Sequence, residues 1–518
     1  MRGTQWEARP YNVPVTLPAV ADGICCALFF VYLAWLPLPF GSASDGAQVW
    51  LIVPSLILCA AALVIRLFTP PTRRHSRTTK LWLAGGLLFT AVMACELLPL
   101  PPGVLGAISP EAARIRVGAD AIARLAGVTA TAPHPFTLDP SDTLLQLLRV
   151  LAYLATFTTG LLLVRGGARR LALAILLVTM AMFEAVFAIH ESSLQRFAIW
   201  GWKNTLMFGR ASGTFVNPNH FAHYAAIILP LAGFLSALAW HQASPSSAPL
   251  GRRVAALIEK RILLFTFGVL GALSCVTSIV IAQSRGAIFA VLGGVALGSA
   301  LTMSGRKSAA RRLLAGLLVV AVLAMGVLLL GQGGIARRLG ADQAAGMGGR
   351  RVPIRAALRI WTMFPLVGSG ANTFENVVLM VEGSGEILYN HAHNDYVEIA
   401  ATMGVVGLMA ALIPLLAGYA LLSRGLRRRD HQSWRRRAFQ TAALTSVGIA
   451  LTHALVDFNF FIPANPSTLA AIAGAAAGAS ARRRRVGGSA EDWPAEAPSP
   501  SDPSLDSPAP SEEPKEAG

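Results

Sequence analysis

Residues 389–407, YNHAHNDYVEIAATMGVVG, place six polar side chains suited to acid–base or hydrogen-bonding chemistry at the start of an apolar segment. They are His391, His393, Asn390, Asn394, Asp395 and Glu398. Asp395 with Glu398 three residues later resembles a capping box, which predicts a helix from there to about Leu422. His393 would then lie just outside the helix N-terminus, where the positive end of the helix dipole disfavours a charged imidazole.

A neutral His393 at the mouth of a membrane cavity can accept a proton from a hydroxyl group. The alternative is that His391 and His393 are interfacial loop residues without chemistry. The spacing alone does not decide between the two interpretations.

Arg285 is a second candidate, because it lies in a short turn, IAQSRGAIFA, between two apolar segments. Only Gln283 and Ser284 accompany it as polar residues. An arginine at such depth in a membrane is costly and indicates function. The alternative is a snorkelling side chain that fixes the turn.

Two further polar clusters flank apolar segments. The first, GRASGTFVNPNHFAHY, contains Arg210, Asn217, Asn219, His220 and His223. Its Asn-Pro-Asn sequence is typical of a turn, which explains part of the cluster without function. The second, LTHALVDFNFFIPANP, contains His453, Asp457 and Asn459. Asp457 either orients a histidine or balances an arginine, or else it caps a helix end.

Arginines are also frequent between two late apolar segments, at positions 337, 338, 350, 351, 355 and 359. Arg351, Arg355 and Arg359 are spaced to line one face of a helix, with Pro353 in its first turn. Val352, Ile354, Leu358, Ile360 and Trp361 would supply its apolar side. Such a helix at the membrane surface either contacts anionic lipid headgroups or captures a diphosphate.

The composition indicates a polytopic membrane protein. The chain has 518 residues, of which 54% are hydrophobic and 14% charged, and its mean hydropathy is +0.54. A net charge of +17 suggests nucleic-acid binding, but most basic residues lie in short runs between apolar segments, as the positive-inside rule expects. All five cysteines fall inside apolar segments without metal-site spacing, so neither a metal site nor disulfides are expected. Residues 1–19 are polar and contain prolines, and no cleavable signal peptide is expected.

Hydropathy predicts an all-α chain with about twelve membrane spans of roughly 20 residues each. They lie near residues 20–38, 47–67, 80–99, 146–164, 170–190, 220–240, 263–283, 286–303, 312–331, 399–421, 438–457 and 464–481. The basic loops fall on one side of these spans, which predicts a cytoplasmic location for that side and for both termini.

The domain prediction follows from these spans. Residues 1–145 form N-terminal spans and a first large periplasmic loop, and residues 146–481 form the main membrane region with a periplasmic loop at about 332–398. Residues 482–518 are rich in Pro, Ser, Ala and Glu, which predicts a disordered cytoplasmic tail.

Four separate segments therefore present arginine, histidine, amide and carboxylate groups to one membrane face. A transporter site would instead lie near the membrane midplane, close to broken helices in matching halves. Glu184 and His190, within the fifth predicted span, are interpreted as satisfied polar groups of the core.

Several motifs resemble, in order, the signatures of the O-antigen ligase and polymerase superfamily. They are GTFVNPNHFAHYAAIILPLA, SRGAIFA, IRAALRIWTMFPLVGSGANTF, HAHNDYVEIAATMGVVGL and HALVDFNFFIPANP, and they span about residues 147–474. The ligase signature, a His, then Asn, Ser or Gln, nine residues and Gly-x-x-Gly, corresponds to His393, Asn394, Gly404 and Gly407.

The resemblance implies a GT-C-like, all-helical membrane glycosyltransferase with a periplasmic loop between late spans. Such enzymes use glycans on undecaprenyl diphosphate and need neither nucleotide sugar nor metal, so no cofactor is expected. By correspondence, His393 is the catalytic histidine, and Arg285 and Arg210 belong to the donor site. Six other candidates are assigned to donor binding: Asn217, Asn219, Arg351, Arg355, Arg359 and Asn394. Two more, His391 and Asp457, are assigned to support of the catalytic histidine.

The sequence thus predicts a glycosyltransferase of the bacterial inner membrane that transfers a glycan to a hydroxyl at the periplasmic face. The acceptor is lipid A core, a growing polysaccharide or a protein, and the motifs do not distinguish these. The alternative function is a flippase or transporter of lipid-linked glycans, whose helices would also face a cationic cavity.

Overall fold

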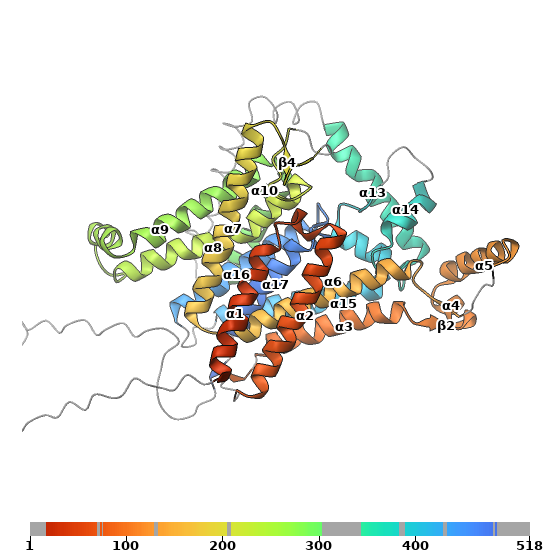
Figure 1. The fold of residues 1–518 in the computed structure, drawn as a ribbon, viewed down its shortest axis with the longest axis horizontal. Helices are drawn as coiled ribbons and strands as arrows, with labels where there is room; N and C mark the ends of the chain where they lie inside the picture. The colour runs from red at the N-terminus through yellow and green to blue at the C-terminus, as the bar shows by residue number, and fades with distance from the viewer. Residues whose placement is uncertain are drawn as a thin grey trace, which may run out of the picture.

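The computed structural model describes residues 17–69, 73–74, 76–128, 133–204, 209–302, 343–382, 389–427, 433–479 and 482–483. Helices dominate these residues (Figure 1), so the prediction of an all-α chain is confirmed to the extent that the chain is mostly helical. The strands are two residues long and form three antiparallel pairs. The pairs are β1 Arg73–Arg74 with β6 Arg482–Arg483, β2 Pro99–Leu100 with β3 His134–Pro135, and β4 Ala198–Ile199 with β5 Trp202–Lys203.

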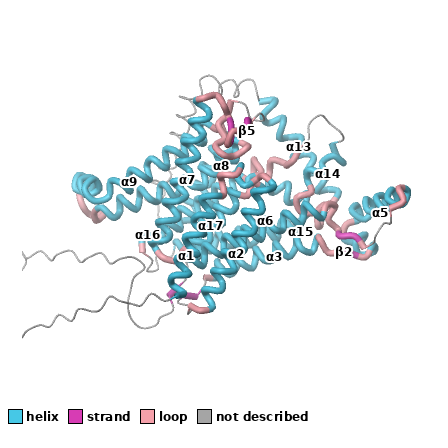
Figure 2. The backbone as a smooth tube through the Cα atoms, viewed as in Figure 1, coloured by secondary structure: helices cyan, strands magenta, loops and turns pink. Residues whose placement is uncertain are grey.

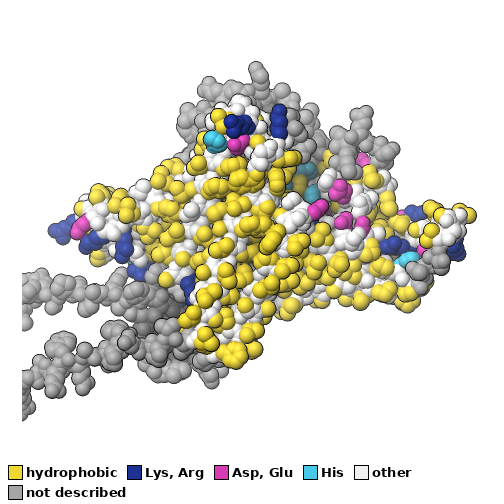
Figure 3. Space-filling model, in the orientation of Figure 1, with side chains coloured by type: hydrophobic (Ala, Val, Ile, Leu, Met, Phe, Trp, Pro, Cys, Tyr) yellow, Lys and Arg dark blue, Asp and Glu magenta, His cyan; other side chains and the backbone are white. Residues whose placement is uncertain are grey.

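Seven described helices are long and apolar enough to cross a membrane. They are α1 Leu17–Trp35, α2 Asp45–Leu67, α6 Pro140–Leu163, α7 Gly167–Ser193, α8 Pro218–Ala243, α9 Leu250–Ile281 and α15 Asp395–Arg427. Hydrophobic side chains cover much of the visible outer face of this bundle, and charged ones gather near its edges (Figure 3). An apolar outer surface of this extent is expected where lipid is the solvent, so the chain is a multi-pass membrane protein.

The predicted count of twelve spans is too high for the described residues. Four other predicted spans do form helices, α3 Arg77–Glu96, α10 Arg285–Thr302, α16 Trp434–His453 and α17 Ala464–Ala479, but none meets the same length and hydropathy requirement. The physical reasons are visible in their sequences, since α16 carries three arginines in its first turn and α17 has only 16 residues. The span predicted at 312–331, Arg337, Arg338 and the tail from 487 lie outside the described residues.

Helix α8 forms the centre of the bundle and packs against α7, α9 and α16. Glu184 on α7 is buried there and accepts hydrogen bonds from the backbone N–H of Thr214 at 2.9 Å and from its hydroxyl at 2.6 Å. The interpretation of Glu184 as a satisfied core residue is therefore confirmed. His190, six residues further along the same helix, is exposed, so the same interpretation was wrong for it.

Two segments far apart in sequence pack together into a layer at one end of the bundle (Figure 1). One contains α4 Pro102–Ile108 and α5 Pro110–Leu125, and the other contains α13 Gln343–Met363 and α14 Phe374–Glu382. Their shared core includes Leu105, Phe136, Ile360, Phe364 and Phe374. The beginning of α15 lies at this end, and Figure 2 shows loops around it.

Helix α15 is interrupted at Gly404, where φ is +65° and ψ is −169°. Because of this interruption, the next two N–H groups donate to carbonyls outside the helix. Val405 donates to Pro365 at 3.0 Å and Val406 to Leu366 at 3.1 Å. A Cβ at Gly404 would lie only 2.2 Å from the Leu366 carbonyl oxygen. Only glycine readily adopts this conformation and permits this approach.

Replacing Gly404 by alanine is expected to lower the free energy of unfolding by about 1–3 kcal/mol through backbone strain, before the clash is counted. Thermal unfolding of the purified protein in detergent measures the effect. Gly118→Ala is the matched control, because Gly118 lies in α5 with no atom within 4 Å of a new Cβ. Equal melting temperatures for the two variants would contradict the proposed strain.

Candidate active site

Asn394, rather than Asp395, caps helix α15. Its side-chain oxygen accepts hydrogen bonds from the N–H groups of Tyr396 and Val397, both at 3.1 Å, and its amide nitrogen donates to the carbonyl of Leu455 at 2.9 Å. The predicted start of the helix is confirmed, but the predicted capping box is wrong. The contacts of Asn394 also explain this residue as a structural one, without requiring donor binding.

His393, the residue before the cap, has a φ of +54°, which is uncommon outside glycine and marks a constrained position. Its Nδ1 lies 3.3 Å from Oδ1 of Asp457. Asp457 follows the end of α16, 64 residues later in the chain. Because a carboxylate only accepts hydrogen bonds, this contact assigns the hydrogen to Nδ1 and leaves Nε2 as the basic nitrogen.

Asp457 is completely buried and collects contacts from three elements. Nη2 of Arg350, on α13, lies 3.3 Å from Oδ2, and Nε2 of His220, on α8, lies 4.0 Å from Oδ1. The adjacent Phe458 N–H donates to Oδ1 at 3.1 Å. Asp457 thus both orients a histidine and balances an arginine, as two of its sequence interpretations proposed.

Burial by itself would raise the pKa of Asp457. The hydrogen bond with His393, followed by the charges of His220 and Arg350, outweighs burial and holds the pKa well below its usual range. Asp457 is therefore ionised, and its charge is available to stabilise a proton on His393.

His391 forms a second carboxylate–histidine pair. Its Nδ1 lies 2.7 Å from Oε1 of Glu398, while Oε2 of Glu398 accepts the Ala392 N–H at 2.8 Å. The ring of Phe458 contacts both histidines, stacked on His391 at 4.2 Å between centroids and T-shaped to His393 at 4.9 Å. The two histidines therefore share one aromatic neighbour and have separate carboxylates.

The arginine and asparagine residues of the early cluster hold the backbone around this site. Nε and Nη2 of Arg210 donate to the carbonyl of Ala282 at 3.0 and 2.7 Å, and Nη2 also donates to Asn219 at 2.8 Å. Asn217 caps α8 by accepting the Asn219 N–H at 2.9 Å. Arg210 thereby fixes the turn that precedes Arg285.

Arg285 begins α10 and its side chain is exposed. Beside it, a Cβ on Gly286 would lie 2.9 Å from Nε2 of His453, which shows how closely the start of α10 approaches the end of α16. Nδ1 of His453 in turn lies 2.8 Å from Nδ1 of His223. These contacts bring the Arg285 turn to the region of α16 that leads into Asp457.

The three arginines predicted to bind a diphosphate lie on the outer side of α13. Arg351, Arg355 and Arg359 are exposed, and Arg359 pairs with Glu382 at 3.3 Å. Helix α13 begins at Gln343, so Pro353 is inside it rather than in its first turn, and Leu358 is exposed instead of buried. Arg350 contacts Asp457, and sequence reasoning missed it because it lies off the 351–355–359 face.

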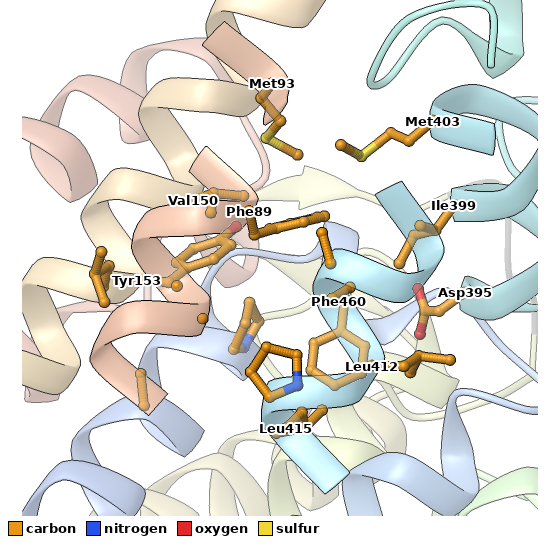
Figure 4. Close-up of a pocket in the computed structure, with 18 of the residues that line it drawn as sticks. Phe89, Met93, Val150, Tyr153, Asp395, Ile399, Met403, Leu412, Leu415 and Phe460 are labelled. Atoms are coloured by element: carbon orange, nitrogen blue, oxygen red, sulfur yellow. The ribbon is translucent and has the colours of Figure 1, made fainter. Parts of the chain in front are cut away.

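An apolar cavity of about 320 Å³ adjoins this site between α3, α6, α15 and α17. Its wall includes Phe89, Met403 and Phe460, and Asp395 is the one carboxyl group among its lining residues (Figure 4). Asp395 is two residues from His393 in the chain, and Phe461, which also lines the cavity, contacts the His391 ring, so the cavity lies next to the histidine pairs. Among the described residues, no group of three or more His, Cys, Asp or Glu side chains is arranged to hold a metal ion.

Residues 270–412 match the family model described as O-antigen ligase. This segment contains Arg285, Arg350, His391, His393 and Glu398, while Arg210 and Asp457 lie outside it. The match is shorter than the resemblance over about 147–474 noted in the sequence. No curated protein matches the chain.

Proposed function

We propose that the protein transfers a glycan from undecaprenyl diphosphate to an acceptor hydroxyl at the periplasmic face of the bacterial inner membrane, and the match of residues 270–412 to the O-antigen ligase family model supports this proposal. The observation that carries the proposal is the His393–Asp457–Arg350 arrangement beside an apolar cavity. The acceptor is a hydroxyl of lipid A core, of a growing polysaccharide or of a protein.

In the proposed reaction, the acceptor oxygen attacks the anomeric carbon of the donor while the bond from that carbon to the diphosphate oxygen breaks. Nε2 of His393 accepts the hydroxyl proton, and the buried charge of Asp457 stabilises the imidazolium that results. The electron pair of the broken bond stays on the diphosphate. One in-line displacement predicts inversion at the anomeric carbon.

The departing diphosphate gains negative charge, which guanidinium groups would stabilise. We assign this role to Arg285, whose side chain is exposed at the start of α10 and whose neighbour Gly286 lies against His453. Arg210 contributes mainly by holding the Arg285 turn through Ala282. The adjoining apolar cavity is suited to the hydrocarbon of a lipid carrier.

The test follows radiolabel from an undecaprenyl-diphosphate-linked oligosaccharide in membranes that contain the wild-type protein or Arg285→Ala. Label is expected to leave the lipid in the wild type, with or without chelator, and about 10- to 100-fold more slowly in the variant. The mobility of the product separates core ligation from chain growth.

Two outcomes would contradict the proposal. Label that stays on the lipid while the lipid-linked glycan crosses the membrane would indicate a flippase or transporter instead. Undiminished transfer by Arg285→Ala at normal membrane levels would remove Arg285 from the donor site. Lys80→Ala, a basic residue at the other end of the bundle in α3, is the control for a general loss of charge.

A further inference from the structure

Glu398 holds His391 more closely than Asp457 holds His393. The Glu398–His391 contact is 2.7 Å against 3.3 Å for Asp457–His393, and Glu398 is almost completely buried. Its second oxygen is occupied by the Ala392 N–H at 2.8 Å. Both oxygens of Glu398 therefore have a hydrogen-bond partner, His391 and Ala392, and these two contacts fix the orientation of the carboxylate.

The position of Glu398 determines what the His391 ring can do. Because a carboxylate only accepts hydrogen bonds, Nδ1 of His391 carries the hydrogen and Nε2 keeps a free electron pair. Within the described residues, Nε2 has no hydrogen-bond partner, and a fifth of the side chain is exposed. His391 therefore offers a hydrogen-bond acceptor that no described residue uses.

The aromatic contacts separate this acceptor from the proposed base. His391 stacks on Phe458 and also contacts Phe461 at 4.8 Å between centroids, whereas the rings of His393 and Phe458 form a T-shaped pair. The two imidazoles therefore differ in their orientation to the Phe458 ring and in the carboxylate that each contacts. His391 is placed to contact a neighbouring group of the substrate.

We propose that Nε2 of His391 binds a sugar hydroxyl of the lipid-linked glycan, and that Glu398 is the positioning residue that fixes the ring for this contact. The inference rests on the proposed function only in taking a lipid-linked glycan as ligand. It assigns a glycan contact to a site residue distinct from the base and from the diphosphate-binding arginines.

Glu398→Gln tests this directly, because glutamine can keep the Ala392 contact through its oxygen while its NH₂ faces His391. An NH₂ donor reverses the tautomer, so that Nε2 carries the hydrogen and can bind a sugar hydroxyl only by donating to it, which the hydroxyl must accommodate by turning its own hydrogen to another partner. The purified full-length protein is titrated with two probes, undecaprenyl diphosphate alone and undecaprenyl diphosphate bearing a neutral disaccharide. The variant is expected to bind the glycosylated lipid about 3- to 10-fold more weakly and the bare lipid unchanged.

A double-mutant cycle separates positioning from a purely structural role. His391→Phe keeps a ring on Phe458 but removes both nitrogens, and Glu398→Gln is expected to cause no further loss in that background. A structural Glu398, which merely holds Ala392, would cost affinity in both backgrounds. Glu111→Gln, which changes a partly exposed carboxylate on α5 that pairs with Arg114, is the control.

The inference is overturned if the wild type does not prefer the glycosylated lipid, if Glu398→Gln weakens both probes equally or neither, or if its effect persists in the His391→Phe background. Binding needs no turnover, so these outcomes are independent of the transfer assay. Absent transfer together with selective loss of glycan binding would reject the proposed function and leave this inference standing.

Discussion

Replacing His393 by alanine is expected to lower the rate of glycan transfer by about 100- to 10,000-fold, the range typical of losing a general base. The hydrogen on Nδ1 is held by buried Asp457, so the lost group is the basic Nε2 nitrogen. The fold should be little affected, because more than a quarter of the side chain is exposed. The measurement is the initial rate at which label leaves the lipid, normalised to the amount of protein in the membrane.

His393→Asn is the matched variant for this test. Asparagine tolerates the positive φ of position 393 better than most residues and retains a polar side chain. An equal loss of rate in both variants would attribute the effect to the imidazole rather than to backbone strain. Wild-type rates in both variants, with a loss in His391→Ala, would move the base from His393 to His391.

The sequence supplied the local part of this site well, because local structure depends on neighbouring residues. The start of α15 near residue 395 was predictable from polar residues placed before an apolar run. The identity of the cap was not, because Asn394 and Asp395 are both good capping residues. Asn394 is the cap, and its amide also donates to the carbonyl of Leu455, which is 61 residues away in the chain.

The contacts between segments could not be predicted from spacing. Arg350 and Arg351 are neighbours in one arginine-rich helix, yet only Arg350 faces the carboxylate of Asp457, more than 100 residues away. The sequence predicted Glu398 as one of the two residues of a capping box, but its carboxylate contacts His391 and Ala392 instead. Such choices depend on how α13, α15 and α16 pack.

The predicted number of membrane spans was too high for a related reason. Hydropathy identifies apolar segments, but α17 is short and almost wholly buried inside the bundle, rich in alanine and glycine rather than in large apolar residues. An apolar helix that is covered by protein on every side has the same composition as one that faces lipid. Composition alone therefore does not separate the two.

Replacing Asp457 by asparagine is expected to have the second large effect, on stability as well as on transfer. The side chain keeps its shape, but Arg350 and His393 lose the buried negative charge that they share. Breaking a buried ion pair in this way costs about 3–5 kcal/mol, and the lower end applies because Arg350 remains partly exposed to water. The rate of transfer should fall by about 100-fold or more, because His393 loses the group that fixes its tautomer and stabilises its proton.

The Arg359–Glu382 pair provides a matched comparison, because its charged atoms are separated by the same 3.3 Å but lie at the surface. Glu382→Gln should change the free energy of unfolding by less than about 1 kcal/mol. Thermal unfolding and label transfer are measured for both variants. If Asp457→Asn matched Glu382→Gln in stability and kept the full rate of transfer, burial of the carboxylate would not affect stability. The His393–Asp457 pair could then not be the group that accepts the proton. If Asp457→Asn instead lost transfer but kept its stability, the fold would accommodate the asparagine amide without cost. Asp457 would then act only by orienting His393.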